Sequence, residues 1–239
     1  MDLIIGCGEV GKSLNKVISQ YYSAVIYDKS FQLPISNYFR REVIRIDFMH
    51  ICFPYSPTFV QDVKQYKEIM QPRFTVIHST VPVGTSSLCE ATHSPIIGKH
   101  PFMDNSIKTF TKFVGGKDAD AVAEHFRSMD IKVQICRKSS TTELAKIADT
   151  TFYAVCIEYI KGLERKCSLY DVPFSEVFTL YQQNYNKGWS ELGYPEYSRP
   201  VLQPIQSKQG GHCTVSNLDF YNSKFSDLVK HLNERDWDV

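Results

Sequence analysis

Two short stretches of the chain combine glycines with side chains that can react. The first covers residues 6–11 (GCGEVG) near the start, and the second covers residues 210–213 (GGHC) near the end. Glycine lets a backbone turn sharply or approach a ligand closely. A cysteine beside glycines can be a small core residue, a metal ligand or a nucleophile, and the residue type alone leaves all three open for Cys213.

The stretch at 6–11 fits the G-x-G-x-x-G fingerprint of dinucleotide-binding proteins. An apolar run precedes it, a helical pattern follows it, and Asp28 closes the next apolar run 22 residues after Gly6. In this fingerprint the glycines allow a tight turn, a close approach of pyrophosphate to a helix N-terminus, and close packing of helix on strand. The alternative is an accidental glycine-rich turn in another α/β protein.

The acid at the end of the second apolar run indicates which dinucleotide is bound. Asp28 can accept a hydrogen bond from a ribose 2′-hydroxyl and would repel a 2′-phosphate, which favours NAD over NADP. Lys29, the next residue, carries a positive charge that opposes this preference. The sequence predicts an NAD site that includes Gly6, Gly8, Glu9, Val10, Gly11 and Asp28.

Short apolar runs alternate with helical patterns over the first part of the chain. The expected strands cover 2–5, 23–28, 49–54, 74–79, 94–100, 110–116 and 132–136, and the expected helices cover 8–20, 59–70 and 118–129. Such alternation predicts βαβ units in a parallel sheet that is covered on both faces.

The pattern changes from about residue 140. The stretch 140–167 predicts one long helix, 174–188 and 225–235 predict two more, and a loop rich in proline and glycine lies between these two. The expected fold is α/β, a Rossmann-type doubly wound parallel sheet over 1–138, followed over 139–239 by a smaller helical domain with a long central helix.

Composition excludes several classes of partner. The chain has 239 residues, 27 basic and 26 acidic, and a formal net charge of +1, which gives no electrostatic basis for binding nucleic acid or an acidic membrane surface. No apolar run approaches the ~18 residues of a membrane span, and the first residues do not have the pattern of a signal peptide. Seven cysteines occur singly, which favours a reducing cytoplasm. We expect a cytoplasmic protein with a small-molecule substrate.

Four motifs together resemble the UDP-glucose/GDP-mannose dehydrogenase family. They are HSTVPVGTS at 78–86, the acid-led strand from Asp47 to Pro54, E-x-x-K at Glu143 and Lys146, and the loop at 210–213. The G-G-H-C form of that loop is similar to the UDP-N-acetylmannosamine dehydrogenase branch. The motifs follow the family's order at similar spacing, so the resemblance spans about residues 1–220.

The resemblance implies an NAD-dependent enzyme that oxidises a sugar primary alcohol twice. In the family, the loop cysteine forms a thiohemiacetal and then a thioester, which water hydrolyses to the acid. By motif, Cys213 takes this role, Lys146 stabilises negative charge on the reacting oxygen, and Thr80 helps to position water. Pro54, Ser79 and Thr80 would line the cofactor. The family also implies a homodimer along the long helix, with Leu144, Ile147, Phe152, Val155 and Ile160 as its apolar residues.

The chain departs from the family at several positions. Thr150 replaces an asparagine one turn after the helix lysine, and Asn217 replaces an aspartate four residues after the cysteine. The family's N-P-E is replaced by the stretch 99–103, in which His100 could act as acid or base. Only 26 residues follow Cys213, so the resemblance implies a truncated form without the C-terminal domain. We therefore expect a different or smaller substrate, or a second chain that completes the site.

Other interpretations of the same residues remain open. The protein could be a catalytically retired NAD-binding sensor or scaffold, or a two-electron hydroxyacid-type dehydrogenase, whose family also has a lysine on a long helix and has no use for the cysteine loop. Lys146 could be a solvated lysine paired with Glu143 or Asp149, Thr80 a helix cap, and His100 structural. His212-Cys213 and His50-x-Cys52 are only pairs, so no metal site is expected.

Overall fold

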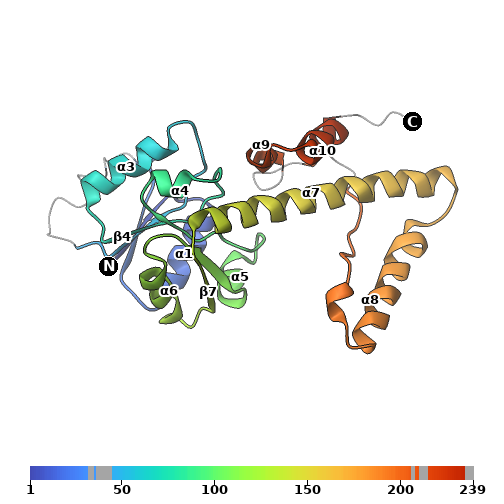
Figure 1. Cartoon of the computed structure of the whole chain (residues 1–239), viewed down its shortest axis with the longest axis horizontal. Helices are drawn as coiled ribbons and strands as arrows, with labels where there is room; N and C mark the ends of the chain where they lie inside the picture. The colour runs from blue at the N-terminus through green and yellow to red at the C-terminus, as the bar shows by residue number, and fades with distance from the viewer. Residues whose placement is uncertain (32–34, 36–44, 206–207, 210–214, 235–239) are drawn as a thin grey trace. The chain divides into compact units, whose positions relative to one another are not determined.

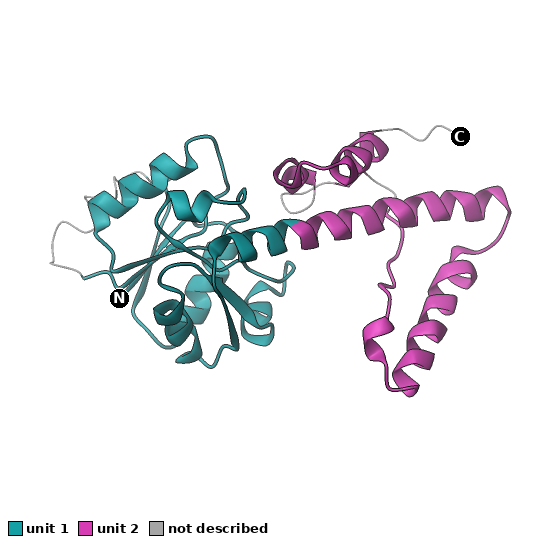
Figure 2. Ribbon diagram, in the orientation of Figure 1, with its two compact units in different colours: residues 1–147 teal, residues 148–239 magenta. Residues whose placement is uncertain are grey.

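The computed structural model describes residues 1–31, 35, 45–205, 208–209 and 215–234 (Figure 1). The chain forms two compact units, 1–147 and 148–239 (Figure 2). The long helix α7 (Ser139–Leu169) runs from the first unit into the second. The first turns of α7, up to residue 147, belong to the compact unit that contains the sheet. The boundary predicted at residue 138 stays a prediction.

The first unit is built on one sheet of seven strands in the order β2-β1-β3-β4-β5-β6-β7. The strands are β1 (Asp2–Ile5), β2 (Ala24–Tyr27), β3 (Phe48–Ile51), β4 (Phe74–Ile77), β5 (Thr92–His93), β6 (Lys112–Gly115) and β7 (Val133–Cys136). All four residues of β1 are buried, as expected for a strand covered on both faces. The predicted Rossmann-type α/β fold is confirmed.

Two details of the predicted sheet were wrong. The strand expected over 94–100 is instead the two-residue β5, and no strand covers 94–100. In addition, β5 and β6 pair antiparallel through His93 and Gly115, whereas the other pairs are parallel. An isolated pair of strand residues has no apolar periodicity of its own, so the sequence pattern could not find it.

Helices cover both faces of the sheet. On one face, α1 (Glu9–Ile18), α5 (Met103–Thr109) and α6 (Ala119–Arg127) contribute to a single apolar cluster. On the other face, α3 (Phe59–Met70) and α4 (Thr85–Leu88) border a second cluster. These two cores hold the strand ends in fixed positions, which is what a binding site at the sheet edge requires.

The strand order reverses between β1 and β3. After β1 the chain forms β2 on one side, and then β3 pairs on the other side of β1, with Ile5 opposite Ile51. In open α/β sheets, ligands bind outside the carboxyl ends of the strands at such a switch point. The residues that follow Ile5 and Ile51 are therefore the first place to look for a site.

The second unit is mostly helical. It contains the rest of α7, then η1 (Ser175–Leu180), α8 (Tyr181–Glu191), η2 (Pro195–Tyr197), η3 (Val215–Asn217), α9 (Leu218–Tyr221) and α10 (Lys224–Glu234). Ala154, Leu218 and Val229 form a small buried core. The helices expected at 174–188 and 225–235 are present, the first as a π-helical segment followed by α8. Among the helices of the described ranges, none combines the length and the apolar character that crossing a membrane would take.

We predict that Gly11→Ala destabilises the first unit. A Cβ at this position of α1 would lie 1.9 Å from the Gly6 carbonyl oxygen, so the helix or the loop must shift. Overpacking of this kind costs about 1–3 kcal/mol. Urea unfolding monitored by circular dichroism should show the loss.

Gly162→Ala is the matched control, because it also changes a helical glycine but has no atom within 4 Å of the added Cβ. This variant should be stabilised by about 0.4–1 kcal/mol. Equal unfolding midpoints for the two variants would contradict the close approach of Gly11 to Gly6.

Candidate dinucleotide and catalytic site

The glycine loop after β1 leaves backbone open at the start of α1. Gly6 has a φ of +108°, and a Cβ there would lie 2.8 Å from the Phe53 backbone nitrogen, so this turn requires glycine. Gly8 is the N-cap of α1, and a Cβ on it would meet no atom within 4 Å. The loop thus presents free space beside a helix N-terminus, where backbone N–H groups favour an anion.

Asp28 lies beside this loop, after the end of β2. Its carboxylate accepts hydrogen bonds from the backbone N–H of Cys7, at 2.7 Å, and of Ser30, at 2.9 Å. The hydrogen bond from Cys7 is the largest cause that lowers the Asp28 pKa, so the side chain is held as an ionised acceptor.

A cavity of about 220 Å³ connects the glycine loop with Asp28. Its lining residues come from the ends of β1, β2 and β3 and from helix α3: Ile5, Gly6, Asp28, Lys29, Phe53, Pro54, Asp62 and Tyr66. Pro54, which the sequence assigned to the cofactor, therefore shares a cavity with Gly6 and Asp28. An acid and a base, Asp28 and Lys29, both face this space.

The loop after β4 is tied to its neighbours by hydrogen bonds. The Ser79 hydroxyl donates to the Phe53 carbonyl at 2.6 Å, which joins the ends of β4 and β3. The ring of buried His93 lies 3.2 Å from the Ser79 carbonyl and 2.8 Å from the Thr142 hydroxyl of α7. Thr80, half-buried, follows on this braced backbone.

Glu143 fastens α7 to the turn that begins α4. It is fully buried, and its two carboxylate oxygens accept from the backbone N–H of Gly84, at 2.7 Å, and of Ser86, at 2.8 Å. Gly84 has a φ of +97°, a conformation that favours glycine. The sequence had offered Glu143 as the first residue of the E-x-x-K motif and as a possible partner for Lys146. It gave no signal for this anchoring role, because the backbone partners are 57 and 59 residues away.

Lys146 follows Glu143 by three residues on α7 and is half-buried. The pKa of His93 is lowered to about 4, chiefly by burial, and the positive charge of Lys146 also contributes. The turn of α7 that precedes Lys146 is tied to this part of the sheet, because Thr142 contacts His93 and Glu143 accepts from Gly84 and Ser86. The helix therefore brings a cation to the carboxyl end of the sheet.

A carboxylate oxygen of Glu9 and Nδ1 of His100 contact each other at the start of α1. Both side chains are largely exposed. His100, which the sequence offered as acid or base, therefore lies on the side of the glycine loop. Val10 packs against the apolar cluster that includes α1.

The remaining predicted catalytic residues lie in the second unit. Thr150 is buried on α7, and Asn217 is buried at the end of η3. Cys213 lies in the stretch 210–214, outside the described residues. The structure thus brings together the predicted residues at the ends of β1 to β4, and it leaves the cysteine loop undescribed.

Comparisons with known proteins relate the chain to dehydrogenases by fold. No family model and no curated protein sequence matches it. Among solved structures, UDP-D-ManNAc dehydrogenase from Pyrococcus horikoshii aligns with a TM-score of 0.74 at 17% identity, covering 98% of this chain and 68% of that one. UDP-N-acetyl-mannosamine dehydrogenase from Staphylococcus aureus gives 0.71 at 15%, with 97% and 67% covered.

A third solved structure is close to this chain in length. The 3-hydroxyisobutyrate dehydrogenase from Mycobacterium tuberculosis aligns with a TM-score of 0.67 at 13% identity, covering 97% of this chain and 91% of that one. At these identities the likeness is one of fold. The chain has the Rossmann-type architecture that these dehydrogenases share.

We predict that Glu143→Gln destabilises the protein by about 2 kcal/mol. The amide keeps one acceptor oxygen but turns an NH₂ group toward the second backbone N–H, and hydrogen bonds to a charged group contribute ~1.5–3 kcal/mol each. Thermal unfolding should show the loss. Asp149 is an exposed acid on the same helix, so Asp149→Asn should unfold at the same temperature as the wild type. A neutral effect of Glu143→Gln would contradict the anchoring role.

Lys112 is a buried base beneath the same part of the sheet. Its Nζ lies 3.0 Å from the Ser94 carbonyl oxygen, to which it donates, and 4.9 Å from the centre of the Phe126 ring. Burial lowers the pKa of Lys112 from 10.5 to about 7. The folded protein therefore binds fewer protons than the unfolded chain between these two values, so this residue makes stability rise with pH across that window.

We predict that Lys112→Met removes this contribution. The difference in unfolding free energy between wild type and variant should change by up to about 1.4 kcal/mol per pH unit above pH 7. Urea unfolding at several pH values measures it. Lys132→Met changes an exposed lysine, so its unfolding free energy should change with pH in the same way as that of the wild type. If the unfolding free energy of Lys112→Met also followed that of the wild type at every pH, Lys112 would have an ordinary pKa.

Proposed function

We propose that this chain is an NAD-dependent dehydrogenase that oxidises a sugar or sugar-nucleotide alcohol. The observation that carries the proposal is the pairing of two arrangements at one sheet edge. Open backbone at Gly8 lies beside the fixed carboxylate of Asp28, and the loop after β4 is fastened by Glu143 to the helix that carries Lys146. The first suits a dinucleotide, and the second suits an alcohol whose oxygen becomes negative during oxidation.

Each residue has a role that follows from its surroundings. Bound NAD would supply the hydride acceptor. The N–H groups at the start of α1 would hold its pyrophosphate, and Asp28 would accept from a ribose hydroxyl. Lys146 stabilises the alkoxide by its charge, and Ser79 and Thr80 lie on backbone held by His93.

The choice of NAD over NADP is part of the proposal. It rests on the ionised state of Asp28, which would repel a 2′-phosphate. Lys29, in the same cavity, is the side chain that would oppose this preference.

The covalent route through Cys213 also belongs to the proposal and rests on the resemblance of the 210–213 loop. The thiolate would add to the carbonyl carbon of an intermediate aldehyde to give a thiohemiacetal. Transfer of its hydride to a second NAD would give a thioester, and water would hydrolyse this to the acid and the free thiol. Thr150 and Asn217 would support this chemistry in place of the family's asparagine and aspartate, and His100 would exchange protons near the cofactor. The chain spans about two thirds of the length of the sugar-nucleotide dehydrogenases that it resembles in fold.

A second candidate function is two-electron oxidation of a hydroxyacid. One observation favours it: the fold also aligns with that of a 3-hydroxyisobutyrate dehydrogenase at a TM-score of 0.67. That reaction would use Lys146 and would need no cysteine nucleophile.

A cytoplasmic homodimer through α7 completes the proposal. The six cysteines within the described ranges are free thiols, which fits a reducing compartment. Leu144 and Phe152 are 48% and 58% exposed and suit a contact between copies, whereas Ile147 and Ile160 are buried within the chain itself. The expected interface is therefore narrower than the five residues predicted from the sequence.

We predict that Lys146→Met lowers kcat about 10²–10³-fold, because the charge that stabilises the alkoxide is lost. The assay follows formation of reduced nicotinamide with a panel of nucleotide sugars, simple sugars and hydroxyacids. NAD affinity, measured by calorimetry, should change little. Lys166→Met, at an exposed lysine further along α7, is the matched control and should keep full activity.

Cys213→Ala separates the two candidate functions. In the sugar dehydrogenase, this variant stops after the first oxidation and releases aldehyde, whereas a hydroxyacid dehydrogenase keeps full activity. A wild-type protein that binds NAD but turns over no member of the panel would refute both and support a sensor or scaffold.

A further inference from the structure

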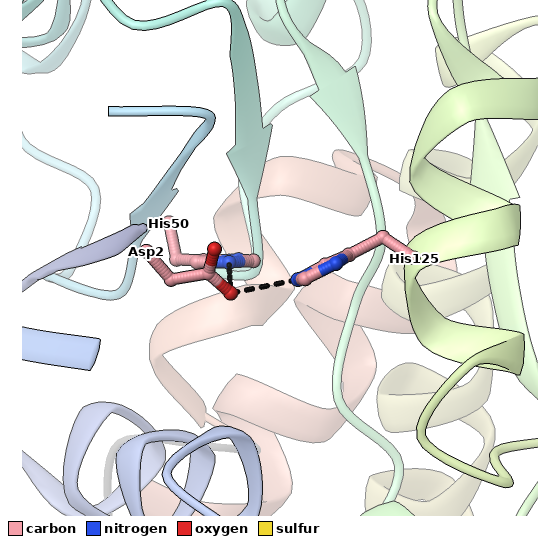
Figure 3. Close-up of side chains that lie close together, drawn as sticks. All are labelled: Asp2, His50 and His125. Carbon is pink, nitrogen blue, oxygen red and sulfur yellow. Dashed lines mark hydrogen bonds and ion pairs between the residues drawn. The ribbon is translucent and has the colours of Figure 1, made fainter. Parts of the chain in front are cut away.

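Three side chains that can bind a metal converge at the opposite edge of the sheet from the glycine loop. Asp2 opens β1, His50 lies in β3, and His125 belongs to α6 (Figure 3). Oδ2 of Asp2 lies 2.7 Å from Nε2 of His125 and 3.5 Å from Nε2 of His50. All three ligand atoms lie within 4.8 Å of one another. Since β1 rises ~3.3 Å per residue, Asp2 lies roughly 13 Å along the strand from Gly6.

The three residues are buried, with exposed fractions of 2%, 0% and 8% for Asp2, His50 and His125. Buried polar atoms are normally satisfied by a partner. Nε2 of His50 is an exception: within the described residues it has no hydrogen-bond partner, although it points at Asp2. This atom therefore needs an explanation.

Neighbouring hydrogen bonds decide which nitrogen of His50 carries the proton. Nδ1 of His78 lies 2.7 Å from the Ser94 carbonyl oxygen and 3.3 Å from Nζ of Lys112, which itself donates to Ser94 at 3.0 Å. The carbonyl oxygen can only accept, so at the shorter distance this nitrogen donates to it. In the neutral ring, Nε2 of His78 then accepts, and at 3.0 Å it faces Nδ1 of His50, which must donate. The proton of neutral His50 is thus on Nδ1, and its Nε2 carries a bare lone pair.

We propose that Asp2, His50 and His125 bind a divalent transition-metal ion of the Zn²⁺ type, with a fourth position left for water. A bare imidazole lone pair beside a carboxylate oxygen at 3.5 Å places two electron-rich atoms face to face, and a cation between them resolves the conflict. Ligand atoms around tetrahedral Zn²⁺ lie about 3.4 Å apart, within the range of separations found here. Two nitrogens and one oxygen favour Zn²⁺ or Co²⁺ over Mg²⁺ or Ca²⁺.

The surroundings of the ligands have the features of a metal site. The N–H of His50 is held by His78, as the second nitrogen of a metal-bound histidine usually is. The ring of His125 stacks on Phe48 with centroids 3.9 Å apart and an interplanar angle of 10°, which fixes its orientation. On metal binding, the proton of neutral His125 resides on Nδ1, so that Nε2 can coordinate.

A cavity of about 560 Å³ gives access to the cluster. Asp2 and His125 line it, together with the acids Asp47 and Glu124. Asp47 is paired with the N-terminal ammonium of Met1 at 2.7 Å, and Arg73 also lines the cavity, so the cavity offers an ion a path to the cluster without a net negative charge. The sequence could not indicate this site, because Asp2 and His125 are 123 positions apart and belong to no spacing motif. The inference is independent of the proposed dehydrogenase activity.

Metal titration of the full-length protein tests the proposal. After removal of metal with a chelator, the protein should bind one Co²⁺ per chain with the visible absorption of tetrahedral Co²⁺ and without a thiolate charge-transfer band. Zn²⁺ should displace the Co²⁺ and raise the midpoint of thermal unfolding, whereas Mg²⁺ should do neither. Asp2→Asn and His125→Gln should abolish the cobalt spectrum, and His78→Gln should weaken binding about 10–100-fold.

His231→Gln is the matched control, because His231 is an exposed histidine on α10. It should bind Co²⁺ like the wild type. Wild-type protein without a tetrahedral Co²⁺ spectrum would overturn the proposal, as would a thiolate band or unchanged binding by His125→Gln. Circular dichroism checks the fold of each variant, and if His125→Gln does not fold, Asp2→Asn, which keeps the side-chain shape, decides.

Discussion

The two hydrogen bonds that Glu143 accepts hold the carboxyl edge of the sheet together. A buried carboxylate needs partners, and the backbone N–H groups of Gly84 and Ser86 provide them. The same contacts fix where α7 begins relative to the loop after β4, and so where Lys146 lies on that helix. Without this anchor the loop would be held mainly by Ser79 and His93, and the lysine would be free to vary in distance from the glycine loop.

The sheet has a different chemical character at each edge. At the carboxyl ends of the strands, glycine turns and hydrogen-bonded loops leave backbone available for a ligand. At the amino ends, Asp2, His50 and His125 form a buried polar cluster beneath α6. The two edges share β1, a fully buried strand in which three residues separate Asp2 from Gly6. One strand therefore connects two sites of unlike chemistry, and its rigidity matters to both.

Local patterns in the sequence were enough to predict the fold, but they could not predict the contacts between distant segments. The glycine fingerprint and Asp28 lie within one βαβ unit, where spacing in the sequence translates directly into distance. The pairing of Glu9 with His100 and the cluster of Asp2 with His125 depend on how distant segments are packed, which no local period encodes. Glu143 is an intermediate case: its motif was visible, but its backbone partners 57 and 59 residues away were not.

The three glycines of the loop at 6–11 are required for three separable reasons. Gly6 serves the backbone conformation and Gly11 serves the packing of helix on strand, so replacing either glycine destabilises the fold itself. A side chain at Gly8 would meet nothing within 4 Å, and folding by itself places no demand on that position. In a lineage that had stopped binding a dinucleotide, mutations at Gly8 would accumulate freely while Gly6 and Gly11 remained. The glycine at position 8 is thus the one whose persistence during evolution reports on the ligand rather than on the fold.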